Sequence, residues 1–480
     1  MSQRDELPAP VPALFPGAAD RERLEEVLTR ELLQVGARVA RGPVIPTLDL
    51  AKFREELGAF DFASPRKLED LLPWTLAHME RGVVHTTHPR YFGLFNPGPT
   101  FPSQCADRIA AAFNPQLASS ASSPVPVEIE AHVIRAIAAR AGLPADATGH
   151  FATGGSEANL TSLICALTRA EPRFANEGVR AFAGPTAVYV SRESHISWLK
   201  LAHQVGIGRT ALRLIDTDGQ GRMEPRALTQ ALSADRAEGR LPVLISATAG
   251  TTGAGMVDPL AACAEIARNE NVWYHVDAAW GGAALASNRL RGVLSGIGQA
   301  DSISIDAHKW FATTMGCAMF ITRHGPLLFE AFHSSTSYMP SSVASLDPYL
   351  NSVQWSRRFL GLRLFLSLAT AGWEGYGAHV ERAVEVTECI KERLLARGWT
   401  VVNSSLLAVL CVLPPPGCAE IQAIVRRVVA SGRAWVAAAT FEGRDAVRIC
   451  ATNGQTTPAD IAELVDVLEA SARGSADAGP

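Results

Sequence analysis

Short apolar runs rich in β-branched residues alternate with amphipathic stretches between about residues 106 and 330. The runs are bounded by polar or turn residues, and segments with helical spacing, such as 258–269, lie between several of them. Such alternation is typical of a mostly parallel sheet covered by helices. The predicted strands are TAVYVS (186–191), PVLISAT (242–248), VWYHVD (272–277), SISID (302–306) and GCAMFIT (316–322).

The two ends of the chain follow different patterns. Apolar residues recur at helical spacing within 19–41, which predicts an amphipathic helix that packs either on its own subunit or on a partner. A long helical stretch near 357–396 leads into shorter runs that suggest a small α+β domain. The Gly/Ala/Ser tail is expected to be disordered. We therefore predict an N-terminal helical segment (1–105), a large domain (106–373), a small C-terminal α+β domain (374–472) and a tail (473–480).

Composition narrows the classes of protein. The chain has 480 residues, enough for one to three folded units, and its formal net charge of -4 argues against a nucleic-acid or anionic-membrane partner. The eight cysteines are scattered, without a C-x-x-C pair or a cluster with histidine, which favours reduced thiols over a disulfide framework or a metal site. The sequence shows neither a signal-peptide pattern in its first twenty residues nor a run of eighteen apolar residues. We expect a cytoplasmic protein without a bound metal.

Reactive side chains follow the ends of two predicted strands, where ligands bind in sheets of this kind. Asp277 ends one strand, and Asp306, His308 and Lys309 follow another. A buried aspartate needs a partner, which is an arginine, a helix N-terminus or a protonated ring nitrogen. Lysine is rarely buried, and desolvation favours an amine that forms imines, although a lysine extending from a strand end to solvent is the alternative.

Two further motifs accompany these residues. T-G-G-S-E-A-N (153–159) precedes a helical run, so it is either a phosphate cradle at a helix N-terminus or a tight turn with a helix cap. His195 follows in S-H-I-S-W. A phosphate anchor, a ring-stacking group, an acid for a pyridine nitrogen and an imine-forming lysine are the parts that a pyridoxal phosphate site requires. Their presence together favours this cofactor.

From about residue 50 to 470 the chain resembles the group II pyridoxal-phosphate decarboxylases, which include aromatic-amino-acid, glutamate and diaminobutyrate decarboxylases. The resemblance implies an α/β architecture of fold type I, with a mostly parallel central sheet and helices on both faces. It also implies a homodimer with both active sites at the subunit interface. The matching motifs are H-P-R-Y-F (88–92), A-T-G-G-S-E-A-N (152–159), G-T-T (250–252), H-V-D-A-A-W-G-G (275–282) and D-S-x-S-x-D-A-H-K-W (301–310).

The resemblance assigns roles to residues of the cofactor site. Gly155 and Ser156 would hold the phosphate, and His195 would stack on the ring. Asp277 would pair with the ring nitrogen, and Lys309 would form the Schiff base. The remaining cofactor contacts expected are Thr252 and Ala279 against the ring and His308 beside the lysine.

The resemblance also assigns residues that act on the substrate. Tyr338, in a Ser-rich stretch typical of a mobile lid, would protonate Cα after CO2 leaves, although an exposed loop tyrosine is the structural alternative. Arg357 would meet the substrate carboxylate, whereas Arg358 could pair with a surface acid. Phe95 and Asn96 lie in a pocket segment, 93–100, that differs from both the aromatic and the glutamate patterns. We therefore expect Phe95 and Asn96 to contact the substrate and leave the substrate open among aromatic, acidic, basic and small aliphatic amino acids.

The expected reaction is decarboxylation of an L-amino acid to its amine. The alternatives are an oxidative deaminase that releases an aldehyde, another fold type I lyase or aminotransferase, and a non-enzymatic paralogue. Tyr338 and His195 argue against the first alternative, and the intact Lys309 and Asp277 argue against the last. Asp306 departs from the asparagine usual in the aromatic enzymes, and no contact is assigned to it.

Overall fold

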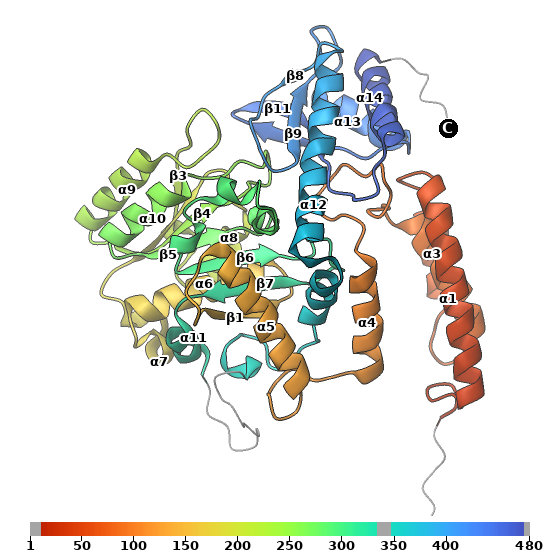
Figure 1. Cartoon of the computed structure of the whole chain (residues 1–480), viewed down its shortest axis with the longest axis horizontal. Coiled ribbons are helices and arrows are strands. Elements are labelled where there is room, and N and C mark those ends of the chain that lie inside the picture. The colour runs from red at the N-terminus through yellow and green to blue at the C-terminus, as the bar shows by residue number, and fades with distance from the viewer. Residues whose placement is uncertain (1–10, 334–346, 475–480) are drawn as a thin grey trace, which may run out of the picture.

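A seven-stranded sheet with the order β1-β7-β6-β5-β4-β2-β3 forms the middle of the molecule (Figure 1). This computed structural model describes residues 11–333 and 347–474. Neighbouring strands from β3 to β6 run parallel, whereas β7 pairs antiparallel with both β1 and β6. The strands are β1 (Thr148–Ala152), β2 (Thr186–Ser191), β3 (Leu212–Ile215), β4 (Leu241–Thr248), β5 (Trp273–Asp277), β6 (Ser302–Asp306) and β7 (Ala318–Thr322).

Helices cover both faces of this sheet, which explains why its strands are continuous apolar runs. In β2, Val188 and Val190 pack with α6, α8 and α11, whereas Ala187 and Tyr189 belong to the cluster of the opposite face, with α5, α9, α10 and α12. The expected fold type I architecture is thereby confirmed for the central sheet. The helices are α5 (Pro124–Ala141), α6 (Gly155–Ala170), α7 (Phe174–Glu177), α8 (Ser197–Gln204), α9 (Pro225–Ala237), α10 (Leu260–Asn269), α11 (Gly325–Phe332) and α12 (Gly361–Leu395).

A smaller antiparallel sheet with the order β10-β11-β9-β8 follows at the end of α12 (Figure 1). Helix α12 spans both sheets and bends at Gly372, whose φ of 64° is readily adopted only by glycine. Apolar side chains of α13 and α14 pack against one face of the small sheet and form a second core. Its elements are β8 (Thr400–Val401), β9 (Val409–Leu413), α13 (Ile421–Ala430), β10 (Ala437–Phe441), β11 (Arg444–Cys450) and α14 (Pro458–Arg473).

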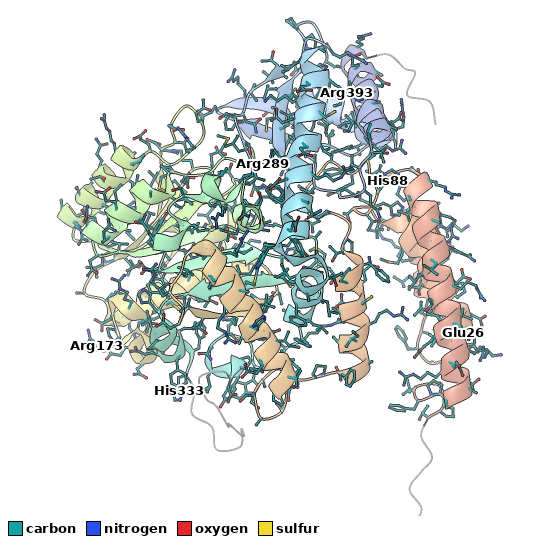
Figure 2. The ribbon with its side chains drawn as sticks, in the orientation of Figure 1. Glu26, His88, Arg173, Arg289, His333 and Arg393 are labelled. Atoms are coloured by element: carbon teal, nitrogen blue, oxygen red, sulfur yellow. The ribbon has the colours of Figure 1, made fainter. Side chains whose placement is uncertain are left out.

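The N-terminal helices lie to one side of the body (Figure 1). Helix α1 packs on α3 but contains no buried residue, and α4 lies against α12. Figure 2 shows His88 between the N-terminal helices and α14, and its carbonyl accepts a hydrogen bond from the side chain of Asn453, in the loop before α14. The division of the chain at residues 105 and 373 stays a prediction. The helices are α1 (Ala18–Arg41), α2 (Leu50–Gly58), α3 (Leu68–Gly82) and α4 (Phe101–Phe113).

Candidate active site

A cavity of about 280 Å³ opens at the carboxyl ends of the parallel strands. It lies between the start of α6 and the loops that follow β2, β4, β5 and β6. Parallel strands deliver their carboxyl ends to one edge of a sheet, which is why residues far apart in sequence meet there. The lining includes Phe95, Gly155, Ser156, His195, Thr252, Asp277, Ala279, His308 and Lys309 from the predicted site, and also Asn159, Trp280 and Asp306.

Lys309 stands in the turn that follows β6. The turn is closed by the Lys309 N–H, which donates to the Asp306 carbonyl at 3.1 Å. The Lys309 side chain is only 20% exposed, and its Nζ lies 3.0 Å from Asp306 Oδ2. Nζ also lies 5.6 Å from the centre of the Phe95 ring. A partly buried amine at the rim of a cavity is well placed to bond covalently to an aldehyde.

Asp277 ends β5 and is 5% exposed. Its carboxylate accepts hydrogen bonds from the Asn159 side chain at 2.8 Å, the Ala279 N–H at 3.1 Å and the Ser304 hydroxyl at 3.3 Å. No cation of the described ranges pairs with it. His275 is close to Asn159, but burial lowers the pKa of His275 to about 4, so this ring is neutral at pH 7. A buried carboxylate that is surrounded only by neutral donors is suited to pair with a positively charged group, such as a protonated ring nitrogen.

The start of α6 provides the anion-binding end of the cavity. The helix begins at Gly155, and the N–H groups of a helix's first turn have no acceptor within the helix. A Cβ at Gly155 would lie 3.1 Å from both carboxylate oxygens of Asp306 and 3.2 Å from Ala279 Cβ, so a side chain here would crowd both residues. The dipole of α6 and these amides fit a phosphate group.

The remaining predicted cofactor residues line the same cavity. His195 Nδ1 lies 2.7 Å from the Ser197 hydroxyl and accepts the Ser197 N–H at 3.2 Å, which fixes the ring. His308 Nδ1 lies 2.9 Å from the Cys317 carbonyl. The residues present therefore fit pyridoxal phosphate at each of its ends. No group of three or more metal-ligating side chains occurs in residues 11–333 and 347–474.

Two predicted substrate residues, Asn96 and Arg357, are not brought to this cavity. Asn96 donates instead to Met315 Sδ at 2.7 Å. Arg357 forms a bidentate ion pair with Glu130, and it borders a separate depression next to α4. Tyr338 falls outside the described residues. Of the three that the structure describes, only Phe95 lines the cavity, where its ring stacks on Trp280 at a centroid distance of 4.1 Å.

Arg448 was not predicted from the sequence. It lies on β11 of the small sheet, is 2% exposed, and donates to the carbonyls of Thr252 at 2.9 Å and Gly93 at 2.6 Å. Its guanidinium lies 4.5 Å from the centre of the ring of Phe95, which lines the cavity. Its Nη2 is buried and has no hydrogen-bond partner in the described part of the chain. The only signal in the sequence was an arginine inside the apolar run AVRIC.

The chain is similar to known proteins over most of its length. Residues 62–410 match the model of the pyridoxal-dependent decarboxylase conserved domain. Cysteine sulfinic acid decarboxylase of Mus musculus is 33% identical over 348 residues, which is 70% of each chain. Aromatic-L-amino-acid decarboxylase of Bacillus atrophaeus is 27% identical over 442 residues, covering 89% of this chain and 90% of the relative.

The fold agrees as well. The crystal structure of mouse CSAD superposes with a TM-score of 0.89 at 26% identity, covering 95% of this chain and 99% of the mouse chain. No helix of the described residues has the length and apolar character needed to cross a membrane.

Proposed function

The chain belongs to the pyridoxal-dependent decarboxylase family, and from this premise we propose how its residues carry out the reaction. The protein is a pyridoxal-phosphate-dependent amino-acid decarboxylase, a carboxy-lyase. Bound pyridoxal phosphate supplies an electron sink for the pair left when the Cα–carboxylate bond breaks. The assignments that follow concern what the residues of this chain do around that cofactor.

The contacts of Asp277 carry the proposal. Asp277 would keep the cofactor ring nitrogen protonated, since its carboxylate is buried among neutral donors and needs a positive partner. Gly155 and Ser156 would bind the phosphate with the first amides of α6. Lys309 would hold the cofactor covalently, because its side chain lines the same cavity.

Four further residues shape the space around the ring. The side chain of His195 is fixed by Ser197 and would stack on one ring face. Ala279 and Thr252 line the cavity and would lie against the ring, and His308 stands beside Lys309. Tyr338 lies outside the described residues, so its role as the donor of a proton to Cα rests on its position in the sequence.

We assign the substrate α-carboxylate to Arg448 in place of Arg357. Arg448 contacts two residues that line the cavity, Thr252 and Phe95, and retains an unpartnered buried Nη2. A buried N–H group without an acceptor is costly, and an incoming carboxylate would satisfy it. Arg357 instead pairs with Glu130 and borders a separate depression, away from this cavity.

Arg448→Met tests this assignment. We expect KM to rise about 10- to 100-fold, the range for losing a hydrogen bond to a charged group, while inhibition by the amine product, which has no carboxylate, stays unchanged. Arg363→Met is the matched control, because Arg363 is also buried and also donates to two backbone carbonyls. These carbonyls belong to Met315 and Gly316, which lie outside the cavity lining. Equal losses of affinity for substrate and amine would show that Arg448 only supports the cavity wall.

The substrate is not fixed by the family. The relatives named above act, by their names, on an acidic and on an aromatic amino acid. A screen of the proteinogenic amino acids with diaminobutyrate, ornithine and cysteine sulfinate, following CO2 and amine together, identifies the substrate. We expect equal amounts of CO2 and amine; aldehyde, ammonia and peroxide in place of amine would instead support the oxidative alternative.

We also propose a homodimer in the cytoplasm. Helix α1 buries no residue within its own chain, and its Leu32 and Leu33 side chains are large, apolar and exposed. A second copy would cover this surface. The eight cysteines are all free, which suits a reducing compartment. Sedimentation of the wild type and of a Leu33→Glu variant tests the dimer, which the variant should weaken.

A further inference from the structure

Asp306 is a second carboxylate inside the cavity, and the mechanism above does not use it. It ends β6, next to the strand that ends in Asp277, and is 4% exposed. Its Oδ2 lies 3.0 Å from Lys309 Nζ. Its Oδ1 is buried and has no hydrogen-bond partner within the described ranges. One oxygen of this buried carboxylate is therefore left without a hydrogen bond.

The carboxylate lies next to the start of α6, where the proposed function places the cofactor phosphate. Both oxygens lie 3.1 Å from the position that a Cβ of Gly155 would take, and Gly155 is the first residue of α6. Asp277, in contrast, contacts Asn159, one turn further along the same helix. A phosphate held by the first amides of α6 would thus lie close to an anion. Two anions in a partly desolvated site repel each other strongly.

Two described cationic or titratable groups face Asp306. Lys309 is the nearer, and His308 Nε2 lies 3.7 Å from Asp306 Oδ2. The other titratable groups that line the cavity are Asp277, Glu157 and His195. Lys309 balances Asp306 in this structure, but under the proposed function the same amine is committed to the cofactor. Among the described residues that line the cavity there is no arginine and no second lysine to offset the repulsion between Asp306 and the phosphate.

We propose that Asp306 weakens the hold of this site on the cofactor phosphate, so that the protein exchanges its cofactor more readily than a site with a neutral amide at this position. The inference rests on the proposed function, because it needs the phosphate at the start of α6. Asp306 acts as a positioning residue through charge, and its replacement by asparagine keeps the shape while removing that charge.

Cofactor binding to the apoprotein tests the proposal. The dissociation constants of pyridoxal phosphate and of pyridoxal, which has no phosphate, are measured for wild type and Asp306→Asn by tryptophan fluorescence quenching. We expect Asp306→Asn to bind pyridoxal phosphate at least about tenfold more tightly, with a change of about twofold or less for pyridoxal, since one charge beside a dianion is removed. Inorganic phosphate should also compete more strongly with the cofactor in the variant.

Asp301→Asn is the matched control, because Asp301 lies at the other end of the same strand, immediately before β6, and pairs with His324. We expect it to bind both ligands like the wild type. Unchanged or weaker binding of pyridoxal phosphate by Asp306→Asn would overturn the inference. An equal gain for pyridoxal would overturn it too, because the effect would then run through Lys309 alone. Absence of saturable cofactor binding by the wild type would count against the proposed function instead.

Discussion

Replacing Arg357 by methionine separates stability from catalysis at a residue for which sequence and structure suggest different roles. The side chains of Arg357 and Glu130 are each 5% exposed, and two guanidinium nitrogens contact the carboxylate, Nη1 at 2.9 Å. Glu130 Oε1 also accepts the N–H of Gly361, the first residue of α12, at 2.9 Å. Methionine keeps the apolar stem of arginine but leaves Glu130 buried without a cation.

The magnitude follows from this burial. Removing one partner of a buried ion pair costs about 3–5 kcal/mol, because the remaining charge is uncompensated. In the double variant Glu130→Gln/Arg357→Met, the amide oxygen can still accept the Gly361 N–H, and no charge is left buried. We expect that variant to lose only about 1–2 kcal/mol, so the second change restores roughly 2 kcal/mol of the free energy of unfolding.

Urea unfolding of the holoenzyme measures the stability of each variant, and steady-state kinetics with the identified substrate measures KM. Arg357→Met should be markedly less stable, with KM within about twofold of the wild type in conditions where it is folded, because an interaction outside the site does not enter substrate binding. A raised KM together with wild-type stability would refute this reasoning. Arg357 would then meet the substrate, as the sequence suggested.

Three further outcomes are expected. Lys309→Ala should abolish turnover and the borohydride-stable attachment of cofactor; substantial remaining activity would contradict its assignment. Asp277→Asn should lower kcat by on the order of 100-fold or more, because a preorganised charge opposite the ring nitrogen is lost, and a kcat near that of the wild type would count against the pairing. Burial, with the nearby Arg357 charge, lowers the pKa of His150 from 6.5 to about 3. As the pH falls, the His150 imidazole is therefore protonated in the unfolded chain before it is protonated in the folded protein. The free energy of unfolding consequently decreases as the pH falls from 6.5 toward 3. His150→Phe should flatten the dependence of stability on pH by up to about 1.4 kcal/mol per unit in that window; an unchanged slope would contradict the shift.

The strands of the central sheet show what local patterns can predict. The predicted run 186–191 coincides with β2, because a strand buried on both faces has a continuous apolar sequence. Strand β1 was missed, since Thr148–Ala152 contains a glycine that local sequence rules associate with turns. Gly149 is needed there because a Cβ would lie 1.9 Å from the Phe320 carbonyl on β7. The antiparallel direction of β7 was also absent from the pattern, which carries no information about strand direction.

The site divides along similar lines. Asp277 and Lys309 could be predicted because parallel strands bring their carboxyl ends to one edge, whatever the details of packing. Arg448 could not, because it reaches the cavity wall from another sheet and bonds to Gly93, 355 residues earlier in the chain. Arg357 was expected at the substrate because its segment resembles one of the decarboxylase family, and that segment does lie near the cavity, where Gln354 contacts Glu157. Only the structure shows that its own side chain points to Glu130.

The two aspartates at the ends of β5 and β6 show why a strand-end acid has no fixed meaning. Both are buried, lie on adjacent strands and line one cavity, so sequence position alone would give them similar roles. Asp277 faces Asn159 and neutral donors, whereas Asp306 faces the first residue of α6 and Lys309. A carboxylate without a cation attracts the positive end of a ligand, but one beside a helix N-terminus competes with any anion that binds there. The part of α6 that each acid faces therefore decides whether its charge favours or opposes the cofactor.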